Sequence, residues 1–175
     1  MDSRDLREAW ADLLRRRSAL AESLAVYGHL VDHWATEPPV TTARDWPPQA
    51  CQEPWSRGLP AIVTAAPDLD PGAVEESLAR VLELAGSVRP DAAPGLQRFA
   101  EAWDRGDVTA RSLFPARGRF GTLDDAIGLD ADLVAFLAVG SLRPLLDAYF
   151  AAGRRHLTDH DWSLGVCPFC GAPPG

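Results

Sequence analysis

Residues 130–150 read DADLVAFLAVGSLRPLLDAYF, and this stretch decides the fold because it contains two helical patterns in direct succession. Asp130 suits the N-cap of a helix that Gly140 is expected to end, and whose apolar residues are Leu133, Val134, Phe136 and Leu137. Ser141 can cap a second helix, with a core face formed by Leu142, Leu145, Leu146, Tyr149 and Phe150. Gly153 is expected near the end of this helix or at a close helix contact. The stretch therefore predicts two helices that belong to a helical core.

Two further helices are predicted upstream. Asp70-Pro71 is a good helix start, with Asp at the N-cap and Pro at the first helical position. Gly86 is a plausible stop for this helix, whose buried face is expected to be Val74, Leu78, Val81, Leu82 and Ala85. The next helix is expected from Pro94 to Trp103, with Leu96, Phe99 and Trp103 directed inward. Residues 107–128 indicate short helical pieces joined by turns.

The N-terminal residues carry an apolar stripe at steps of mostly three and four, which predicts one long first helix. Its members are Leu6, Trp10, Leu13, Leu14, Leu20, Leu24, Tyr27, Val31 and Trp34. Pro38-Pro39 is expected to end it. Residues 36–60 are rich in Pro and Trp and are predicted to form an irregular connector that its indoles pin to the helical body.

No alternating apolar pattern of useful length appears, so strands are not expected. The predicted fold is an all-α body of about five to seven helices over residues 1–160. Residues 161–175 are expected to form an incomplete CPxCG metal knuckle, which is half of a zinc-ribbon or rubredoxin-like site.

Composition limits the function classes. The chain has 175 residues, 46% of them hydrophobic, and a formal net charge of -8, which argues against nucleic acid or an anionic membrane as the main partner. No apolar run long enough for a membrane span occurs, and the polar N-terminus is unlike a secretory signal. Three cysteines, two of them in a CxxC pair, fit a reducing cytosol, so a cytoplasmic location is expected.

The clearest chemical motif is Cys167-Pro168-Phe169-Cys170-Gly171. Proline stiffens the entry, and glycine permits the positive φ that turns backbone N–H groups toward the sulfurs. Tetrahedral zinc or iron needs four ligands, and one such turn supplies two. Three arrangements could complete the set. Two chains could share one site as a homodimer, an additional segment or a partner protein could supply the second pair, or His156 and His160 could be the remaining ligands.

The histidines His156 and His160 have the i, i+4 spacing that places both imidazoles on one face if the last helix extends that far. A polar helix end beside Arg154 and Arg155 explains them equally simply. A thioredoxin-like redox role for the CxxC pair is disfavoured, since that chemistry uses a pair at a helix N-terminus after a strand.

A basic triplet on the first helix, Arg15, Arg16 and Arg17, is a candidate partner-binding site. The simpler interpretation is a solvated face with ion pairs to Asp12 or Glu22. No catalytic motif is present, and the adjacent acidic pairs point apart on a helix. No residue is therefore predicted to be catalytic.

Residues 161–174, DWSLGVCPFCGAPP, resemble a segment of the formate dehydrogenase accessory (FdhE-type) protein family, in which a Trp, a Gly and a CPxCG followed by Pro open the metal-binding portion after a helical body. Two upstream stretches are similar to the same family: residues 15–24, an arginine-and-leucine helix, and residues 55–61, which place a Gly and a Pro before small apolar residues. Family members continue into further CxxC pairs, so this chain is expected to be truncated after the first knuckle.

The resemblance implies a non-catalytic, chaperone-like protein that binds the formate dehydrogenase catalytic subunit and assists its maturation. It implies iron or zinc at Cys167 and Cys170, the positions onto which the ligand role carries. Two alternatives stay open: a metal-dependent enzyme or redox protein that uses a His/Cys site, and a truncated remnant without metal function.

Overall fold

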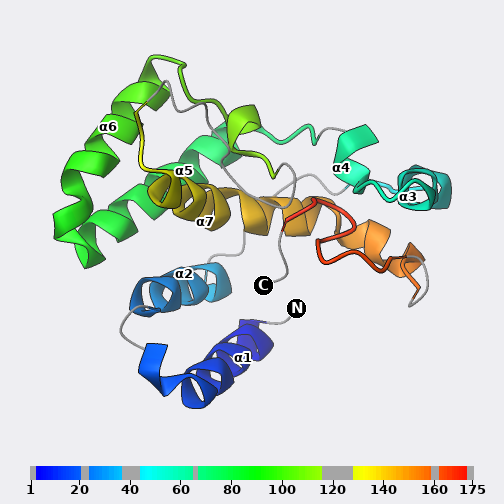
Figure 1. Ribbon diagram of the computed structural model, residues 1–175, viewed down its shortest axis with the longest axis horizontal. Helices are drawn as coiled ribbons and strands as arrows, with labels where there is room; N and C mark the ends of the chain where they lie inside the picture. The colour runs from blue at the N-terminus through cyan, green and yellow to red at the C-terminus, as the bar shows by residue number, and fades with distance from the viewer. Residues whose placement is uncertain are drawn as a thin grey trace.

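The computed structural model describes residues 3–20, 24–36, 44–64, 67–115, 128–158 and 162–172. Regular structure in these ranges is helical without strands, which confirms the predicted all-α class (Figure 1). The described residues form seven α-helices, at the upper end of the five to seven expected. With the four short 3₁₀ turns, the total number of helical elements is higher than expected. Their bounds are α1 Ser3–Arg16, α2 Ala25–Thr36, α3 Pro48–Ser56, α4 Ala61–Thr64, α5 Pro71–Val88, α6 Ala93–Asp104 and α7 Ala131–Tyr149. The 3₁₀ turns are η1 Ser18–Leu20, η2 Pro90–Ala92, η3 Ala110–Leu113 and η5 Ala151–His156.

The central element is α7, which packs along α5 (Figure 1). Asp130 caps it as predicted, accepting a hydrogen bond of 2.7 Å from the Leu133 backbone N–H. The prediction of two helices separated at Gly140 and Ser141 is wrong, because α7 runs through both residues. A Cβ on Gly140 would lie 2.8 Å from Val81 Cγ1, so this glycine permits the close approach of α5 rather than ending a helix. Ser141 is no cap, since its hydroxyl donates to the Leu137 carbonyl within the same helix.

A proline inside α7 creates a junction with two other helices. Pro144 has no N–H, so the carbonyl of Gly140 loses its usual partner four residues on. The Trp34 indole N–H of α2 donates to this carbonyl at 3.2 Å. Ser77 of α5 donates its hydroxyl hydrogen to the neighbouring Ser141 carbonyl at 2.9 Å. The backbone groups near the proline therefore bind α2 and α5 to α7.

The single long first helix that the sequence predicts is wrong. The chain forms two helices, α1 and α2, which pack against each other, and α1 lies outermost (Figure 1). The physical reason is in the stripe itself, since the six-residue step from Leu14 to Leu20 breaks the helical spacing. Trp10 of α1 packs against Gly28 of α2, where a Cβ would lie 3.2 Å from the indole nitrogen.

The ends of α5 and α6 follow local chemistry. Asp70 caps α5 as predicted, accepting from the Ala73 N–H at 3.0 Å. The predicted stop at Gly86 is wrong, because α5 continues to Val88. It ends there since Pro90 disfavours the helical conformation of Arg89. The predicted helix over 94–103 is confirmed by α6.

The predicted irregular connector over 36–60 contains α3, so that prediction is also wrong, and α4 follows directly after it. Pro48 occupies the first turn of α3, where its missing N–H costs no helical hydrogen bond. Gly58, with φ +67°, ends α3, and its N–H donates to the Trp55 carbonyl at 2.9 Å. The expected anchoring by indoles is confirmed, because Trp46 is fully buried and Trp55 is nearly so.

Candidate functional site

The motif at residues 167–171 forms a closed turn, called the CPFCG turn below. The Gly171 N–H donates to the Cys167 carbonyl at 2.9 Å, and the Cys167 N–H donates to the Ala172 carbonyl at 2.7 Å. Gly171 has φ +72°, a conformation that other L-residues rarely adopt. A Cβ there would also lie 3.0 Å from Pro60 Cγ, so both the backbone and the packing require glycine.

The two thiols of this turn lie together. The Cys170 thiol donates a hydrogen bond to Cys167 Sγ, which also receives the backbone N–H groups of Cys170 and Phe169. The Ala172 N–H is directed at Cys170 Sγ. The hydrogen bond from Cys170 is the largest cause that lowers the pKa of Cys167 to about 6, while the same bond and burial raise the pKa of Cys170. The turn therefore stabilises one thiolate at neutral pH.

Main-chain hydrogen bonds attach the CPFCG turn to α4 and α3. The backbone N–H groups of Ala61 and Ile62 donate to the carbonyls of Pro168 and Phe169, at 2.9 and 2.8 Å. The Trp55 indole N–H donates to the same Pro168 carbonyl at 2.8 Å. Because the first N–H groups of a helix have no partner within it, the turn satisfies donors that α4 would leave exposed.

Phe169 anchors the turn in the apolar core. Its ring is almost fully buried and lies 5.3 Å from the Trp55 ring and 5.7 Å from the Phe150 ring, measured between centroids. Gly153 provides the space, since a Cβ on it would lie 3.0 Å from Phe169 Cε1. This agrees with the close contact that the sequence predicts at Gly153. The cysteines are thus fixed to the end of α7 by the side chain between them.

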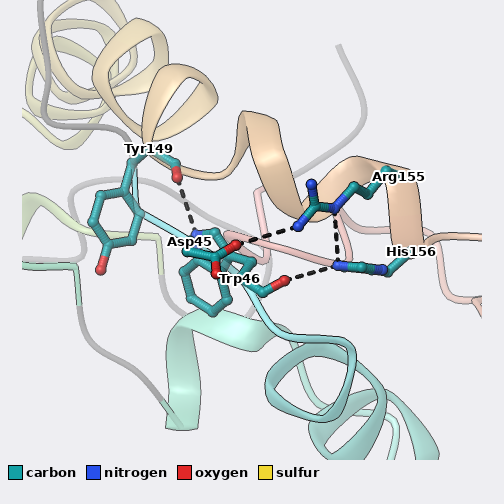
Figure 2. A network of polar contacts seen from close by, with 5 residues as sticks. All are labelled: Asp45, Trp46, Tyr149, Arg155 and His156. Carbon is teal, nitrogen blue, oxygen red and sulfur yellow. Dashed lines mark hydrogen bonds and ion pairs between the residues drawn. The ribbon is translucent and has the colours of Figure 1, made fainter.

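Figure 2 shows how the neighbouring polar network occupies His156. His156 Nε2 lies 2.8 Å from the Trp46 carbonyl oxygen and 3.3 Å from Arg155 Nε. Arg155 pairs with Asp45 at 3.2 Å, and the Trp46 indole N–H donates to the Tyr149 carbonyl at 3.1 Å. These contacts fasten residues 45–46 to the end of α7. They leave Nδ1 as the nitrogen of His156 with which a metal could bind.

The described residues do not bring His156 and the two cysteines into one ligand set. No group of three or more His, Cys, Asp or Glu side chains that could hold a metal occurs within those ranges. Helical structure ends at His156, with Leu157 extended, so the i, i+4 face that would join His156 to His160 does not form. His160 itself lies outside the described residues, and its ligand role stays a prediction.

Cys51 is fully buried, and burial raises the pKa of its thiol. A Cβ on Gly153 would lie 3.4 Å from its sulfur, so Cys51 packs on the side of the Phe169 anchor. It belongs to the core, and among the residues that the structure describes it joins neither a metal set nor a disulfide.

The arginine triplet lies at the end of α1 and is exposed to solvent. Arg15 and Arg16 both pair with Asp12, at 3.1 and 2.6 Å. The hydrogen bond from Arg15 is the largest cause that holds the pKa of Asp12 below its ordinary value. These pairs match the solvated-face interpretation. The partner-binding role of Arg15, Arg16 and Arg17 stays a prediction.

A separate cavity of about 530 Å³ lies where α2, α5, α6 and α7 meet. Apolar side chains such as Tyr27, Leu133 and Phe136 line it, together with Arg89 and Arg98. Arg89 is engaged by Asp91 through two hydrogen bonds of 2.9 and 2.7 Å. No residue of the CPFCG turn lines this cavity, so it does not contribute to the cysteine site.

Sequence reasoning identified the cysteines but missed the residues that hold them. Trp55 lies against Pro168 and Phe169, and Pro60 lies against Gly171, so each contact spans more than a hundred positions of sequence. No local periodicity signals such contacts. One available signal is Phe169 itself, a large apolar residue between two cysteines, which is costly to expose.

Comparisons of the chain with models of protein families, with curated proteins and with solved structures found no match. Among the described residues, no helix combines the length and apolar character needed to cross a bilayer.

Proposed function

We propose that this protein is a non-catalytic accessory factor that binds the catalytic subunit of formate dehydrogenase in the cytoplasm and assists its maturation. The supporting observation is the CPFCG turn: its sequence resembles that of the accessory family, and it is anchored to an all-α body by Phe169 and by main-chain hydrogen bonds. An anchored turn of this kind holds both cysteines in a fixed place, with Cys167 half-buried and Cys170 buried.

In this proposal, Cys167 and Cys170 hold zinc or iron as thiolates. The donor set suits such a metal, because three backbone N–H groups are directed at the two sulfurs and compensate thiolate charge. A metal ion would replace the proton that the two sulfurs now share. The bound metal would supply a structural cross-link, and these residues provide two of the four ligands that a tetrahedral site needs.

The experiment is a binding measurement under reducing, anaerobic conditions between the immobilised chain and a purified formate dehydrogenase catalytic subunit. We expect saturable binding by the wild-type chain. An Arg15→Ala/Arg16→Ala/Arg17→Ala variant tests docking through α1, and a Cys167→Ser/Cys170→Ser variant tests docking through the cysteines. Both must keep the helical circular dichroism of the wild type. If a folded wild-type chain does not bind the subunit at micromolar concentration, the accessory role is wrong.

A second candidate, a redox protein, is favoured by one observation: the hydrogen bond that lowers the pKa of Cys167 makes it a better thiolate at neutral pH. This function requires the two cysteines to reduce a disulfide substrate and to become a disulfide themselves. An insulin-reduction assay with dithiothreitol as electron donor separates the two candidates. Turnover that the double serine variant loses would favour the redox protein, and no turnover above dithiothreitol alone would exclude this activity.

A further inference from the structure

Exposed apolar side chains gather around the CPFCG turn. Among the described residues, the large apolar side chains that are exposed are Leu13, Leu59, Val63, Leu157 and Leu164. Leu59 and Val63 flank the α4 residues that donate to the turn, and Leu164 lies shortly before Cys167. Leu164 Cδ1 is 3.7 Å from the position of a Cβ on Gly58, so the two segments are side by side. Leu59, Val63 and Leu164, with the half-buried Cys167 and the buried Cys170 beneath them, are called the CPFCG face below.

The two segments that form this face carry no charged side chain, in a chain whose formal net charge is -8, and Asp147 is the carboxylate whose charge acts on both thiols. Residues 58–64 read GLPAIVT and residues 162–172 read WSLGVCPFCGA, so neither segment contains Asp, Glu, Lys or Arg. Two acidic chains repel each other over most of their surfaces, but not where these segments would meet. An apolar, uncharged patch on an acidic protein is therefore suited to contact another copy of itself.

The thiols at the face make half of a ligand set. Their hydrogen bond brings the two sulfurs together at one point, where Cys167 is half-buried and Cys170 is 7% exposed. The described residues supply no third ligand beside them. A two-fold axis through that point would bring the same two sulfurs from a second chain, because an isologous contact pairs each patch with its own copy.

We propose that the CPFCG face is an interface between two copies of this chain, which share one metal ion through Cys167 and Cys170 of each. This inference rests on the thiolate-ligand role that the proposed function gives to the two cysteines. It adds that the described residues of one chain supply two of the four ligands and that Leu59, Val63 and Leu164 form the apolar rim of the site. The second copy then supplies both the missing ligands and the cover for the rim.

The test uses the reduced, metal-free chain, titrated anaerobically with Zn²⁺ alone and, in parallel, with Co²⁺ as a spectroscopic probe. Analytical ultracentrifugation gives the mass, and the Co²⁺ absorption reports tetrahedral thiolate coordination. We expect one metal ion per two chains, with a dimer that forms on metal addition and returns to monomer with a chelator. One metal per monomer, or a dimer that is indifferent to the chelator, would overturn the proposal.

Leu164→Asp tests the apolar rim, because it places two carboxylates opposite each other across the axis. We expect the dimer dissociation constant in the presence of Zn²⁺ to rise by at least about 100-fold. Val63→Asp repeats the test from the other segment. Leu13→Asp is the matched control, since Leu13 is 41% and Leu164 50% exposed and α1 lies outside the face. Equal weakening by the control, or an unchanged constant in both rim variants, would overturn the interface.

The outcomes separate this inference from the accessory role. A monomer that binds one metal ion contradicts the shared interface but leaves the ligand role of the cysteines intact. A chain that binds no metal contradicts both the interface and that ligand role. Binding to the formate dehydrogenase catalytic subunit is measured independently of either result.

Discussion

Three cysteines of one chain have three different chemical environments. Cys51 is enclosed by the core, and burial raises the pKa of its thiol. Cys167 is only half-buried and accepts hydrogen bonds that lower its pKa to about 6, whereas Cys170 donates to it and has a raised pKa. Because a thiolate is the reactive form of cysteine, position in the fold decides reactivity here.

We predict the order of alkylation by iodoacetamide in the reduced, metal-free protein at pH 7: Cys167 first, then Cys170, and Cys51 last. The lowered pKa of Cys167 means that its rate rises as the pH passes about 6 and then levels off, since deprotonation creates the nucleophile. Peptide mass spectrometry at successive times measures the order. In denaturant the three sites are expected to react alike. Faster modification of Cys51 than of Cys167 in the folded protein would contradict the described environments.

Helix α7 depends on contacts from its neighbours at the middle of its length. The carbonyl of Gly140 loses its helical partner to Pro144 and receives the Trp34 indole N–H instead. At the same residue, the missing side chain allows Val81 to approach. One position of α7 thus combines a hydrogen bond to α2 with a close contact to α5.

Trp34→Phe is expected to destabilise the protein by about 1–2 kcal/mol, because it removes the donor and leaves the Gly140 carbonyl without a partner. Urea unfolding followed by circular dichroism measures the free energy of unfolding. Pro144→Ala provides the control, since its backbone N–H can bond to that carbonyl. In the Pro144→Ala background the same Trp34→Phe change should cost less, and an equal cost in both backgrounds would contradict this account.

Gly140→Ala is expected to destabilise the protein by up to about 2 kcal/mol. The new Cβ meets Val81 Cγ1 at 2.8 Å, and the resulting strain of about 1–3 kcal/mol exceeds the helix propensity of about 1 kcal/mol that alanine gains. Gly165→Ala is the matched control, because nothing lies within 4 Å of a Cβ there. Thermal unfolding of both variants gives the comparison. A more stable Gly140→Ala protein would show that α5 and α7 can separate without cost.

At the scale of the whole molecule, the CPFCG turn and the helical body share one core. Phe169, Cys170 and Ala172 are buried in the same cluster as Trp46 and Phe150. The C-terminal residues that carry the cysteines therefore contribute to the stability of the body, and the body in turn positions the thiols.

Phe169→Ala is expected to lower the free energy of unfolding by about 3–5 kcal/mol, since it removes a buried aromatic ring and leaves a cavity. The alkylation rates of Cys51 and Cys170 should rise together, because the ring covers the space beside both. Chemical unfolding and peptide mass spectrometry measure the two effects. Leu164→Ala is the control, since that side chain is half exposed and its loss should change stability by less than about 1 kcal/mol.

The sequence predicted those parts of the fold that depend on local chemistry. The caps Asp70 and Asp130 are confirmed, because a side chain that bonds to an N–H three residues later needs no distant partner. Gly86 and Gly140 were wrongly expected to end helices. At Gly140 the reason is the close packing of α5, which outweighs the intrinsic cost of glycine in a helix. The cysteine pair was found by its spacing, but its anchoring by Trp55 depends on the tertiary fold.

The two backbone hydrogen bonds from Ala61 and Ile62 to the CPFCG turn also allow its opening to be followed by amide hydrogen exchange. An amide proton exchanges with deuterium only when its hydrogen bond opens, and local openings range from nearly free to the cost of global unfolding. These two protons lie at the start of α4, yet their acceptors are more than a hundred residues away. Their exchange rates consequently report how often the C-terminal segment separates from the helical body. This measurement is made at Ala61 and Ile62 and does not require chemical labelling of the cysteines.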